Sequence, residues 1–391
     1  MKEFKAIIDA YREIDFGKQM AALATVVKVS GSSYRSPGAR MLITDNGKWV
    51  GSISGGCLEG DALRKARQVM HSREPITVTY DTREESNQNL GIGLGCNGII
   101  DVMIEPVVPD GHNPVRLFEE LVAKNEPRLI ATVFRGSMLA EKVIMAPDGK
   151  LTSRLPDDEL TNRIKADLLR IFERRKTETL TYTTAADDAE VFLELVAPNI
   201  KLMIFGAGFD ARPVSQLAKM LGWDVEVTDE CVAHIAPVFF PDADKLSLCD
   251  RTFIERDFQI TPYTACVLMS HNYEYDRDVL KKLLYSHTPY IGILGPRKRF
   301  DKMLSEFRGE GIEISSERMD TIHSPIGLDI GAETPDEIAL AIISEIKCRF
   351  SSRSGGFLKY RGGPIHLRDP RDGQIFRQIF LQDPDNRQAA G

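Results

Sequence analysis

The sequence lacks the excess of basic residues that nucleic-acid-coating proteins carry. Its 391 residues include 50 Lys and Arg against 57 Asp and Glu, a formal net charge of −7, whereas binding along a phosphate backbone requires a clearly basic face. No apolar run reaches the ~18 residues that span a bilayer, and residues 1–20 follow an amphipathic helical pattern rather than that of a signal peptide. We therefore expect a cytoplasmic protein with small-molecule or protein partners, no nucleic acid and no membrane.

Closely spaced cysteines are also missing. No Cys-x-x-Cys pair occurs, which argues against a zinc knuckle and against a dense disulfide scaffold. Each thiol needs a local argument, since a buried one is usually an inert small hydrophobe. The six cysteines are Cys57, Cys96, Cys231, Cys249, Cys266 and Cys348.

What the chain does have is an ordinary globular composition. Hydrophobic residues make up 42% and charged residues 27%, values typical of folded proteins rather than of disordered or fibrous ones. The length of 391 residues fits two domains, because single domains usually run about 100–200 residues. The sequence shows no internal repeat and no low-complexity segment.

Short strands separated by turn residues dominate the first half. Alternation and β-branched residues predict strands in MAALATVVKVSG, PITVTYDT and NGIIDVMIEP. A stripe of apolar residues predicts a helix over Leu58–His71, and further helices are expected near Val115–Lys124 and Asp157–Arg175. Residues 1–197 are thus predicted to form one mixed α/β domain.

After Pro198 and Asn199 the pattern changes to alternating strands and helices. The strands KLMIFGAG, DVEVTDE, ACVLMSH and YIGILG alternate with helical stretches, an order that builds a parallel sheet with helices on both faces. Thr334 and Glu337 have the spacing of a capping box before a last helix. We predict a Rossmann-like domain with a mainly parallel sheet over residues 198–350, followed by an irregular tail over residues 351–391.

The glycine-rich stretch GSISGGCLEG, at Gly51–Gly60, is the most unusual feature of the first domain. Gly55 and Gly56 let the backbone turn tightly before a helix that starts at or just after Cys57, so backbone amides at that turn would attract an anion. The helix dipole would favour the thiolate of Cys57 as a nucleophile or metal ligand. In the alternative interpretation the glycines only shape the turn and the cysteine is buried.

Two further segments are candidates for the same site. Arg35 and Arg40 flank a Ser-Pro-Gly turn one strand earlier and could hold a phosphate or oxo-anion near the thiol, unless both are simply solvated. The turn GIGLGCNG, at Gly91–Gly98, carries Cys96, which taken alone is a structural cysteine. If the two turns meet, Cys57 and Cys96 could bind a soft metal centre or hand over sulfur.

A dinucleotide-like motif lies in the second domain. Gly206 and Gly208 follow a strand and precede a helix, and Asp229 ends the next strand. In dinucleotide-binding folds such glycines admit the pyrophosphate and such an acid binds the ribose. Asp210 opposes this interpretation, because a carboxylate in the first helical turn would repel a pyrophosphate at the same amides.

Two side chains after later strands are also candidates, since open α/β sheets bind ligands at the carboxyl ends of their strands. His271 follows the strand ACVLM and could act as a base or a hydrogen-bond donor. Arg297 begins the basic run after YIGILGP and could hold a phosphate. The alternatives are structural, namely a histidine that caps a strand and a solvated start of a helix.

Seven motifs follow one another over residues 10–347: GSSYRSPGARMLI, GSISGGCLEG, GLGCNG, FGAGFDA, VLMSHNYEYD, YIGILGPRKR and IHSPIGLDIGAETPDEIALAIISEI. Together they resemble the XdhC/CoxI family of xanthine dehydrogenase accessory proteins. The resemblance spans both domains. Motif by motif, the family's functional positions fall on Gly55, Gly56, Cys57, Glu59, Cys96, Gly98, Gly206 and Gly208.

The resemblance implies a chaperone that transiently binds the molybdopterin cofactor, the molybdenum cofactor. Such a chaperone supports exchange of an oxo ligand for sulfur with a cysteine desulfurase and delivers the product to an apo-enzyme of xanthine dehydrogenase type. The family habit of dimerising implies a homodimer. The cofactor would be gripped in the first domain by Cys57, Cys96, Arg35 and Arg40.

Two rival interpretations come from other classes of protein. One is a scaffold that joins desulfurase and target without any small ligand. The other is an NAD(P)-dependent oxidoreductase, in which NAD(P) would be bound and used by Gly206, Gly208, Asp229 and His271.

Overall fold

The computed structural model describes residues 2–31, 33–82, 98–109, 113–124, 126–248 and 258–360. It divides into two compact units, formed mainly by Glu3–Pro198 and by Asn199–Phe357. The predicted α/β class is confirmed, since the first unit combines antiparallel sheets with helices and the second has a parallel sheet flanked by helices. Within the described ranges, no helix has both the length and the apolar character needed to cross a bilayer.

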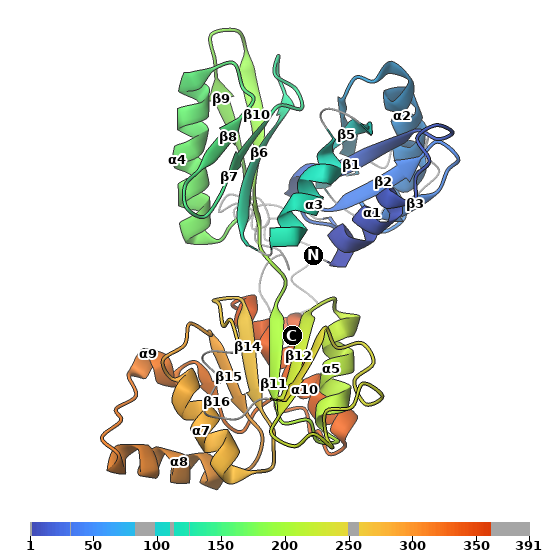
Figure 1. Ribbon diagram of the computed structural model, residues 1–391. Helices are drawn as coiled ribbons and strands as arrows, with labels where there is room; N and C mark the ends of the chain where they lie inside the picture. Colours follow the sequence, from blue (N-terminus) through green and yellow to red (C-terminus); the bar gives the residue numbers. More distant parts are fainter. Residues whose placement is uncertain are drawn as a thin grey trace, which may run out of the picture. The chain divides into compact units, whose positions relative to one another are not determined.

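The described part of the first unit holds two five-stranded antiparallel sheets, with strand orders β3-β2-β1-β5-β4 and β8-β7-β6-β10-β9 (Figure 1). The helices of this unit are α1 (Lys2–Arg12), α2 (Glu59–Ser72), α3 (Pro114–Lys124) and α4 (Asp158–Arg174). The strands are β1 (Ala21–Gly31), β2 (Arg40–Thr44), β3 (Trp49–Gly51), β4 (Ile76–Asp81), β5 (Gly98–Val107), β6 (Arg128–Arg135), β7 (Lys142–Met145), β8 (Leu151–Ser153), β9 (Glu178–Thr183) and β10 (Asp188–Val196).

The two sheets repeat one topology. Three strands, a helix and two strands follow one another in each, as β1-β2-β3-α2-β4-β5 and as β6-β7-β8-α4-β9-β10, and equivalent strands take equivalent places. The expectation that the chain has no internal repeat was therefore wrong. The stretches with similar letters are short, such as Ala-Thr-Val at residues 24–26 and 131–133 and Thr-x-Thr-Tyr at residues 77–80 and 179–182.

The registers of the two copies also agree. Thr25 of β1 pairs with Arg40 of β2, and its counterpart Thr132 of β6 pairs with Lys142 of β7. Each helix covers the outer face of its own sheet in the same way. The apolar residues of α4 recur every three or four positions and pack on sheet residues such as Val143, as expected for an amphipathic helix.

A bulge lies at the same place in each copy. The ladder between β1 and β5 skips Val27, and the ladder between β6 and β10 skips Phe134, so that each bulged carbonyl is left outside its own ladder. The Thr179 hydroxyl donates to the Val27 carbonyl at 2.9 Å, and the equivalent Thr77 hydroxyl donates to the Phe134 carbonyl. The copies are thus joined by one contact made twice, which indicates a pseudo-twofold relation.

Buried ion pairs between the copies follow the same relation. Arg40 makes a bidentate contact with Glu194 of β10 at 2.9 and 2.5 Å, and these side chains are only 6% and 9% exposed. Its counterpart Lys142 pairs with Glu105 of β5. Because a buried charge without a partner is strongly destabilising, each pair ties its strand to the opposite copy.

The second unit has a six-stranded parallel sheet in its described residues, with the order β13-β12-β11-β14-β15-β16. Its strands are β11 (Lys201–Phe205), β12 (Asp224–Asp229), β13 (Lys245–Leu248), β14 (Thr264–Leu268), β15 (Tyr290–Ile293) and β16 (Ile322–His323). Its helices are α5 (Ala211–Met220), α7 (Tyr273–Leu283), α8 (Arg297–Gly309), α9 (Ser316–Met319) and α10 (Pro335–Phe350). A short 3₁₀ turn at Leu358–Tyr360 follows in the chain and is grouped with the first unit.

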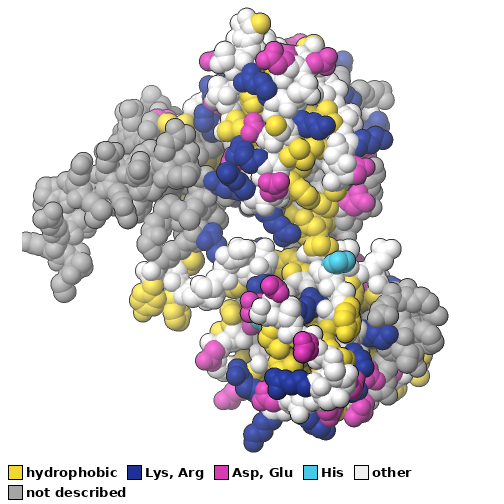
Figure 2. All heavy atoms as spheres, turned by 90° about the vertical axis from the view of Figure 1, so that its left-hand side faces the viewer, with side chains coloured by type: hydrophobic (Ala, Val, Ile, Leu, Met, Phe, Trp, Pro, Cys, Tyr) yellow, Lys and Arg dark blue, Asp and Glu magenta, His cyan; other side chains and the backbone are white. Residues whose placement is uncertain are grey.

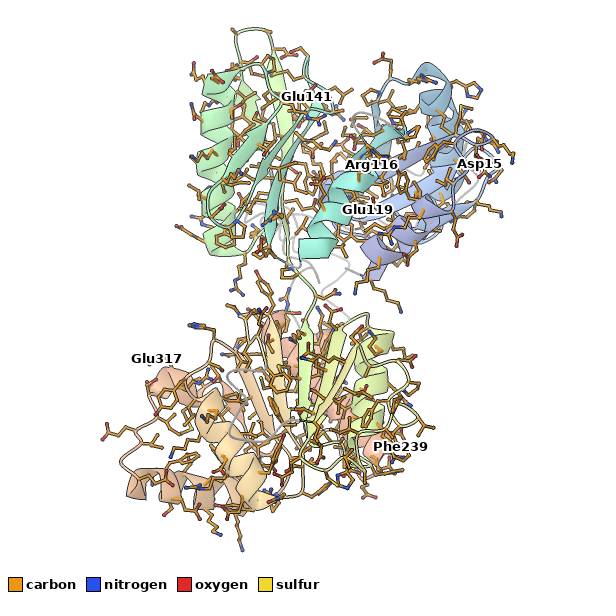
Figure 3. The ribbon with its side chains drawn as sticks, viewed as in Figure 1. Asp15, Arg116, Glu119, Glu141, Phe239 and Glu317 are labelled. Atoms are coloured by element: carbon orange, nitrogen blue, oxygen red, sulfur yellow. The ribbon has the colours of Figure 1, made fainter. Side chains whose placement is uncertain are left out.

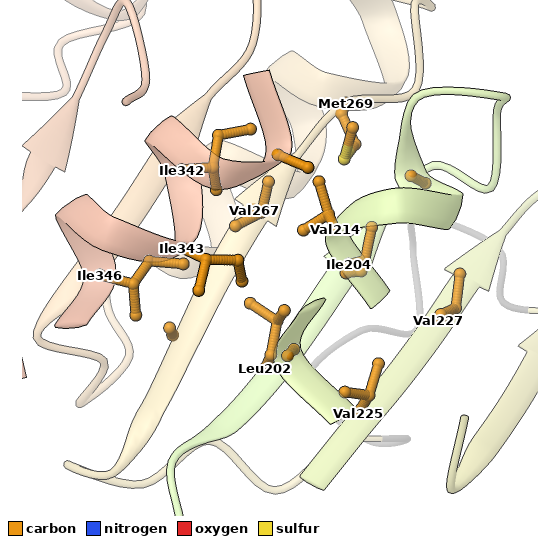
Figure 4. Close-up of a cluster of buried hydrophobic side chains, with 14 of the residues drawn as sticks. Leu202, Ile204, Val214, Val225, Val227, Val267, Met269, Ile342, Ile343 and Ile346 are labelled. Carbon is orange, nitrogen blue, oxygen red and sulfur yellow. The ribbon is translucent and has the colours of Figure 1, made fainter. Parts of the chain in front are cut away.

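Helices cover both faces of this sheet, as the alternating pattern predicts. On one face Ile342 and Ile346 of α10 and Val214 of α5 pack on Leu202 of β11 (Figure 4). On the other face α7 and α8 pack on the same strands. The predicted capping box of α10 is confirmed, with the Thr334 hydroxyl and the Glu337 carboxylate each bound to the other residue's amide.

Candidate functional site

Three connections of the first copy leave its sheet on the side where β1 ends and β5 begins, and we call this side the glycine-rich edge. Gly31, where β1 ends, pairs with Gly98, where β5 begins. The loop that follows Gly31 reaches the turn after β3, since a Cβ added to Gly55 would lie 3.2 Å from the Tyr34 ring. The two segments predicted to lie near each other, at residues 31–38 and 51–60, therefore do meet. Cys96 itself lies outside the described residues.

The same edge of the second copy carries shorter connections. Between strand and helix the first copy has seven residues, 52–58, and the second has four, 154–157. Between the last two strands the first copy has sixteen residues, 82–97, and the second has four, 184–187. Cys57 and Cys96 both fall in the longer connections, so each cysteine belongs to a segment that the scaffold alone does not require.

The start of α2 is closed by the chain's own side chains. The hydroxyl oxygen of Ser54 accepts hydrogen bonds from the amides of Gly56, Cys57 and Leu58 at 3.0–3.2 Å. The Leu58 amide also donates to the carboxylate of Glu59 at 3.1 Å. These three amides of the turn before α2 thus already have an acceptor within the chain, although the N-cap residue Leu58 makes no side-chain cap bond.

Glu59 is the second part of this closure. Its carboxylate accepts from the Ser52 hydroxyl at 2.9 Å, from the Ser54 amide at 2.9 Å and from the Ser54 hydroxyl. Burial alone would raise the pKa of Glu59, but the hydrogen bonds from Ser54 and Ser52 outweigh it and lower that pKa. A charged carboxylate therefore holds the loop, and the Glu59 position carried over from the family is a positioning residue in the structure.

Cys57 is half-buried, with its side chain packed against the apolar core beneath α2. Gly51 and Gly56, which both precede it, have φ values of +87° and +112°, a region that favours glycine. At Gly51 a Cβ would lie 2.3 Å from the Arg40 carbonyl oxygen, so only glycine fits there. The thiol thus follows a backbone turn that needs glycine, and it is neither sealed in the core nor fully exposed.

Both arginines of the predicted site are engaged by carboxylates. Arg40 is buried, and its guanidinium is paired with the Glu194 carboxylate. Arg35 forms an ion pair with Glu3 of α1 at 2.5 Å, and the Arg35 side chain is 30% exposed. Among the described residues no group of three or more His, Cys, Asp or Glu side chains is arranged to hold a metal ion, so Cys57 is the one predicted metal ligand that the structure places.

In the second unit the glycine motif meets the end of β14. Gly206 has a φ of +109°, and a Cβ there would lie 2.3 Å from the Cα of Ser270. Gly208 faces His271, whose ring would be 3.4 Å from an added Cβ. His271 in turn lies 3.5 Å from the carboxylate of Asp210. Gly206 is therefore required by the close approach of Ser270, whether or not a nucleotide binds, whereas nothing in the packing around Gly208 requires a glycine.

Asp229, the predicted ribose ligand, is 5% exposed. Its two carboxylate oxygens accept from the amides of Ala207 at 2.7 Å and of Cys231 at 2.8 Å. It therefore links the ends of β11 and β12.

The basic run at the start of α8 is split between two roles. Arg299 pairs at 2.6 Å with Asp276, which is buried. Burial raises the pKa of Asp276, and the contacts with Ser270 and Arg299 oppose this rise. Arg297 and Lys298 are exposed at the first two positions of the helix and are the members of the run that remain open to a ligand.

Sequence reasoning missed Ser54 and Glu194. Ser54 begins the Ser-x-x-x-x-Glu spacing of the turn, and serine hydroxyls often bond to nearby backbone amides, but this spacing is not a helix-capping signal. Glu194 lies 154 residues from Arg40, and no local pattern points to that pairing.

Comparison with known proteins bears on both units. Residues 17–81 match the model of the XdhC and CoxI family, and residues 202–346 match that of the XdhC Rossmann domain. A probable xanthine dehydrogenase subunit of Bacillus subtilis is 30% identical, and the match covers 88% of this chain and 97% of that protein. The molybdenum cofactor insertion chaperone PaoD of Escherichia coli is 22% identical over 83% of this chain and 82% of its own length.

A solved structure agrees with the same assignment. The crystal structure of a xanthine dehydrogenase from Bacillus halodurans superposes with a TM-score of 0.72 and 28% identity, and the match covers 90% of this chain and 97% of that one. Both units thus have counterparts in relatives of nearly equal length. The chain belongs to the XdhC and CoxI family.

Proposed function

We propose that this chain is a chaperone that binds the molybdenum cofactor and assists its insertion into an enzyme of xanthine dehydrogenase type. The functions of the relatives support this, since one is a molybdenum cofactor insertion chaperone and another is a probable xanthine dehydrogenase subunit. The observation that carries the proposal is the position of Cys57. It lies in a connection of seven residues whose counterpart in the second copy has four, beside the edge where Gly31 pairs with Gly98.

Cys57 would supply the chemistry of the site. A thiolate is a soft donor that suits a molybdenum centre and is also a carrier of sulfur. The chain's own residues fix where that sulfur lies, because Ser54 and Glu59 hold the backbone on either side of it. Cys96 would complete the pair from the neighbouring connection, and a cysteine desulfurase would be the source of sulfur.

Binding of the phosphate end of the pterin needs a cation at this edge. Arg40 is taken up by Glu194, which leaves Arg35 as the basic candidate. The ion pair of Arg35 with Glu3 is partly exposed, and an exposed pair of this kind is weak enough for a phosphate to displace the carboxylate. Cytoplasmic location and a homodimer belong to the same proposal.

A reconstituted loading assay tests the proposal. Purified chaperone loaded with molybdenum cofactor is mixed with an apo-enzyme of xanthine dehydrogenase type, and the molybdenum retained and the activity gained are measured. We expect Cys57→Ser to lose cofactor retention or activation of the enzyme. The control is Cys231→Ser, a half-buried thiol of the second unit, which should load normally. Normal loading by Cys57→Ser would contradict the proposal.

A further inference from the structure

A groove of about 740 Å³ lies on the first unit, away from the glycine-rich edge. One wall is the beginning of α3, the other is the inner face of β7 and β8, and Glu105 of β5 lies between them. Glu105 is seven residues along β5 from Gly98, which corresponds to about 24 Å in an antiparallel strand. The groove and the Cys57 loop are therefore separate places on the same unit.

The two copies differ in how this flank is covered. In the first copy Leu42 of β2 and Val50 of β3 face inward and pack in the cluster formed with α1 and α3. Their counterparts by register are Ile144 of β7 and Thr152 of β8, and both line the groove. The surface that helices cover in the first copy is thus open in the second.

Basic side chains predominate around the groove. The three acidic ones are Glu105, Glu120 and Glu141, and the six basic ones are Arg73, Arg116, Arg128, Lys142, Lys150 and Arg154. This local excess of basic side chains contrasts with the formal net charge of the chain, which is −7. A concave surface on which one sign of charge predominates attracts ligands of the opposite charge.

Several of these cations are available to a ligand. Lys142 is neutralised by Glu105, and Arg128 pairs with Glu126 at 2.9 Å. Arg116 and Lys150, by contrast, are exposed, and their side chains make no hydrogen bond or ion pair with another described residue. They come from opposite walls, Arg116 from α3 and Lys150 from the turn before β8.

Apolar side chains complete the groove. Pro75, Pro106, Leu117, Leu139 and Ile144 lie among the charged residues. Figure 3 marks Arg116 and Glu141, which belong to the two facing walls. A site of about 300–1,000 Å³ that combines an apolar surface with a few charged groups is typical for a small organic ligand, and arginine matches the geometry of phosphate.

We propose that this groove binds a small organic phosphate monoester, with the phosphate held between Arg116 and Lys150 and the organic part on the apolar wall. This inference does not depend on the proposed function, because it involves neither Cys57 nor its loop. Guanosine 5′-monophosphate is a suitable probe, since it joins one phosphate to a flat ring system.

Calorimetry on the full chain at low salt tests the proposal. We expect guanosine 5′-monophosphate to bind more tightly than guanosine or inorganic phosphate alone. Arg116→Glu and Lys150→Glu should each weaken that binding by about 10- to 100-fold, as expected for loss of a charge-assisted contact. Thermal unfolding of each variant checks that the fold is retained, and both positions are exposed on their elements.

The matched control is Lys165→Glu. Lys165 is exposed on α4, whose outer face mixes basic, acidic and hydrophobic side chains in the upper part of Figure 2. The same change of charge there should leave binding unaltered, as should Cys57→Ser. The proposal is overturned if the wild type does not bind the probe, if both groove variants bind it normally, or if Lys165→Glu weakens it equally.

Discussion

The hydroxyl of Ser54 accepts a hydrogen bond from the Cys57 amide at 3.0 Å and at the same time donates one to the carboxylate of Glu59. A side chain of the protein therefore accepts from amides of the turn before α2, the turn that was expected to attract an anion. This arrangement lowers the pKa of Glu59 despite its burial. It also fixes the backbone of the cysteine without any bound ligand, and so makes the loop testable in the isolated chain.

Replacing Glu59 with Gln should change how stability depends on pH. The pKa of Glu59 in the folded chain lies below its ordinary value of 4.5. Its contribution is therefore fully present above the unfolded pKa and is lost as pH falls through the folded pKa. We expect Glu59→Gln to lower the free energy of unfolding by about 1–3 kcal/mol at neutral pH, as for a buried group that loses charged hydrogen bonds.

Urea unfolding at a series of pH values, from about pH 7 down to about pH 3, measures this effect. The difference between wild type and Glu59→Gln should shrink toward the acid end. Glu173→Gln, at an exposed position of α4, is the control and should follow the wild type. Parallel curves for wild type and Glu59→Gln would show that the carboxylate is not held in its charged form.

The cysteines should differ sharply in reactivity. Cys57 is half-buried, whereas Cys266 of β14 is fully buried and its pKa is raised by that burial to about 12. At about pH 8 only ~1 in 10⁴ of the Cys266 thiols would be thiolate. Alkylation of the native protein followed by peptide mass spectrometry should therefore label Cys57 first and Cys266 only after unfolding. Equal labelling of both in the native state would contradict the structure.

The buried pair of Arg40 and Glu194 should show strong coupling. Removing either partner leaves a buried charge unpaired, at a cost of about 3–5 kcal/mol, while replacing both with apolar residues costs much less. We expect Arg40→Met and Glu194→Leu each to be severely destabilised and the double variant to be rescued in urea unfolding. The exposed pair of Lys18 and Asp15 is the control, with coupling of about 0–1 kcal/mol. Additive effects at Arg40 and Glu194 would refute the pairing.

Gly206 should tolerate no side chain. Its φ of +109° and the 2.3 Å approach of Ser270 predict that Gly206→Ala lowers the stability of the second unit by about 3 kcal/mol or more. Gly309 at the end of α8 has open space around it, so Gly309→Ala should instead stabilise by about 0.5–1 kcal/mol. Fluorescence of the buried Trp223 in a Trp49→Phe background reports on this unit. A neutral Gly206→Ala variant would contradict the described turn.

The oxidoreductase interpretation makes a separate prediction about NAD(P). Asp210 lies 3.5 Å from His271 beside the glycine turn, and the Asp229 carboxylate is occupied by backbone amides. We expect calorimetry with the oxidised and reduced forms of NAD(P) to show no binding in the micromolar range. Micromolar binding that is lost in Gly208→Val would reverse this conclusion and support the rival function.

Local patterns in the sequence predicted most of the elements correctly. The apolar stripe of α2, the capping box of Thr334 and the strand-helix alternation after Pro198 depend on neighbours within a few residues, and such signals are visible in the chain itself. The glycine at position 206 was found for the same reason, although its role in packing against Ser270 was not.

What could not be predicted depends on residues far apart in the chain. The pairing of Arg40 with Glu194 and the bond from Thr179 to Val27 each cross more than 150 residues. The duplication was missed because a fold is kept by burial pattern and register, which many sequences satisfy, rather than by residue identity. Ser54 was missed because the competition between its hydroxyl and an outside anion is decided only by the exact shape of the loop.

The reciprocal bonds from Thr77 and Thr179 to the two bulges have a consequence for how this unit can vary. These bonds and the ion pairs of Arg40 and Lys142 join residues of the strands, and none of them uses a residue of the connection at 52–58. That connection can therefore lengthen, shorten or change chemistry while these bonds keep the two halves together. A doubled framework of this kind separates the part that must stay constant from the part that is free to vary.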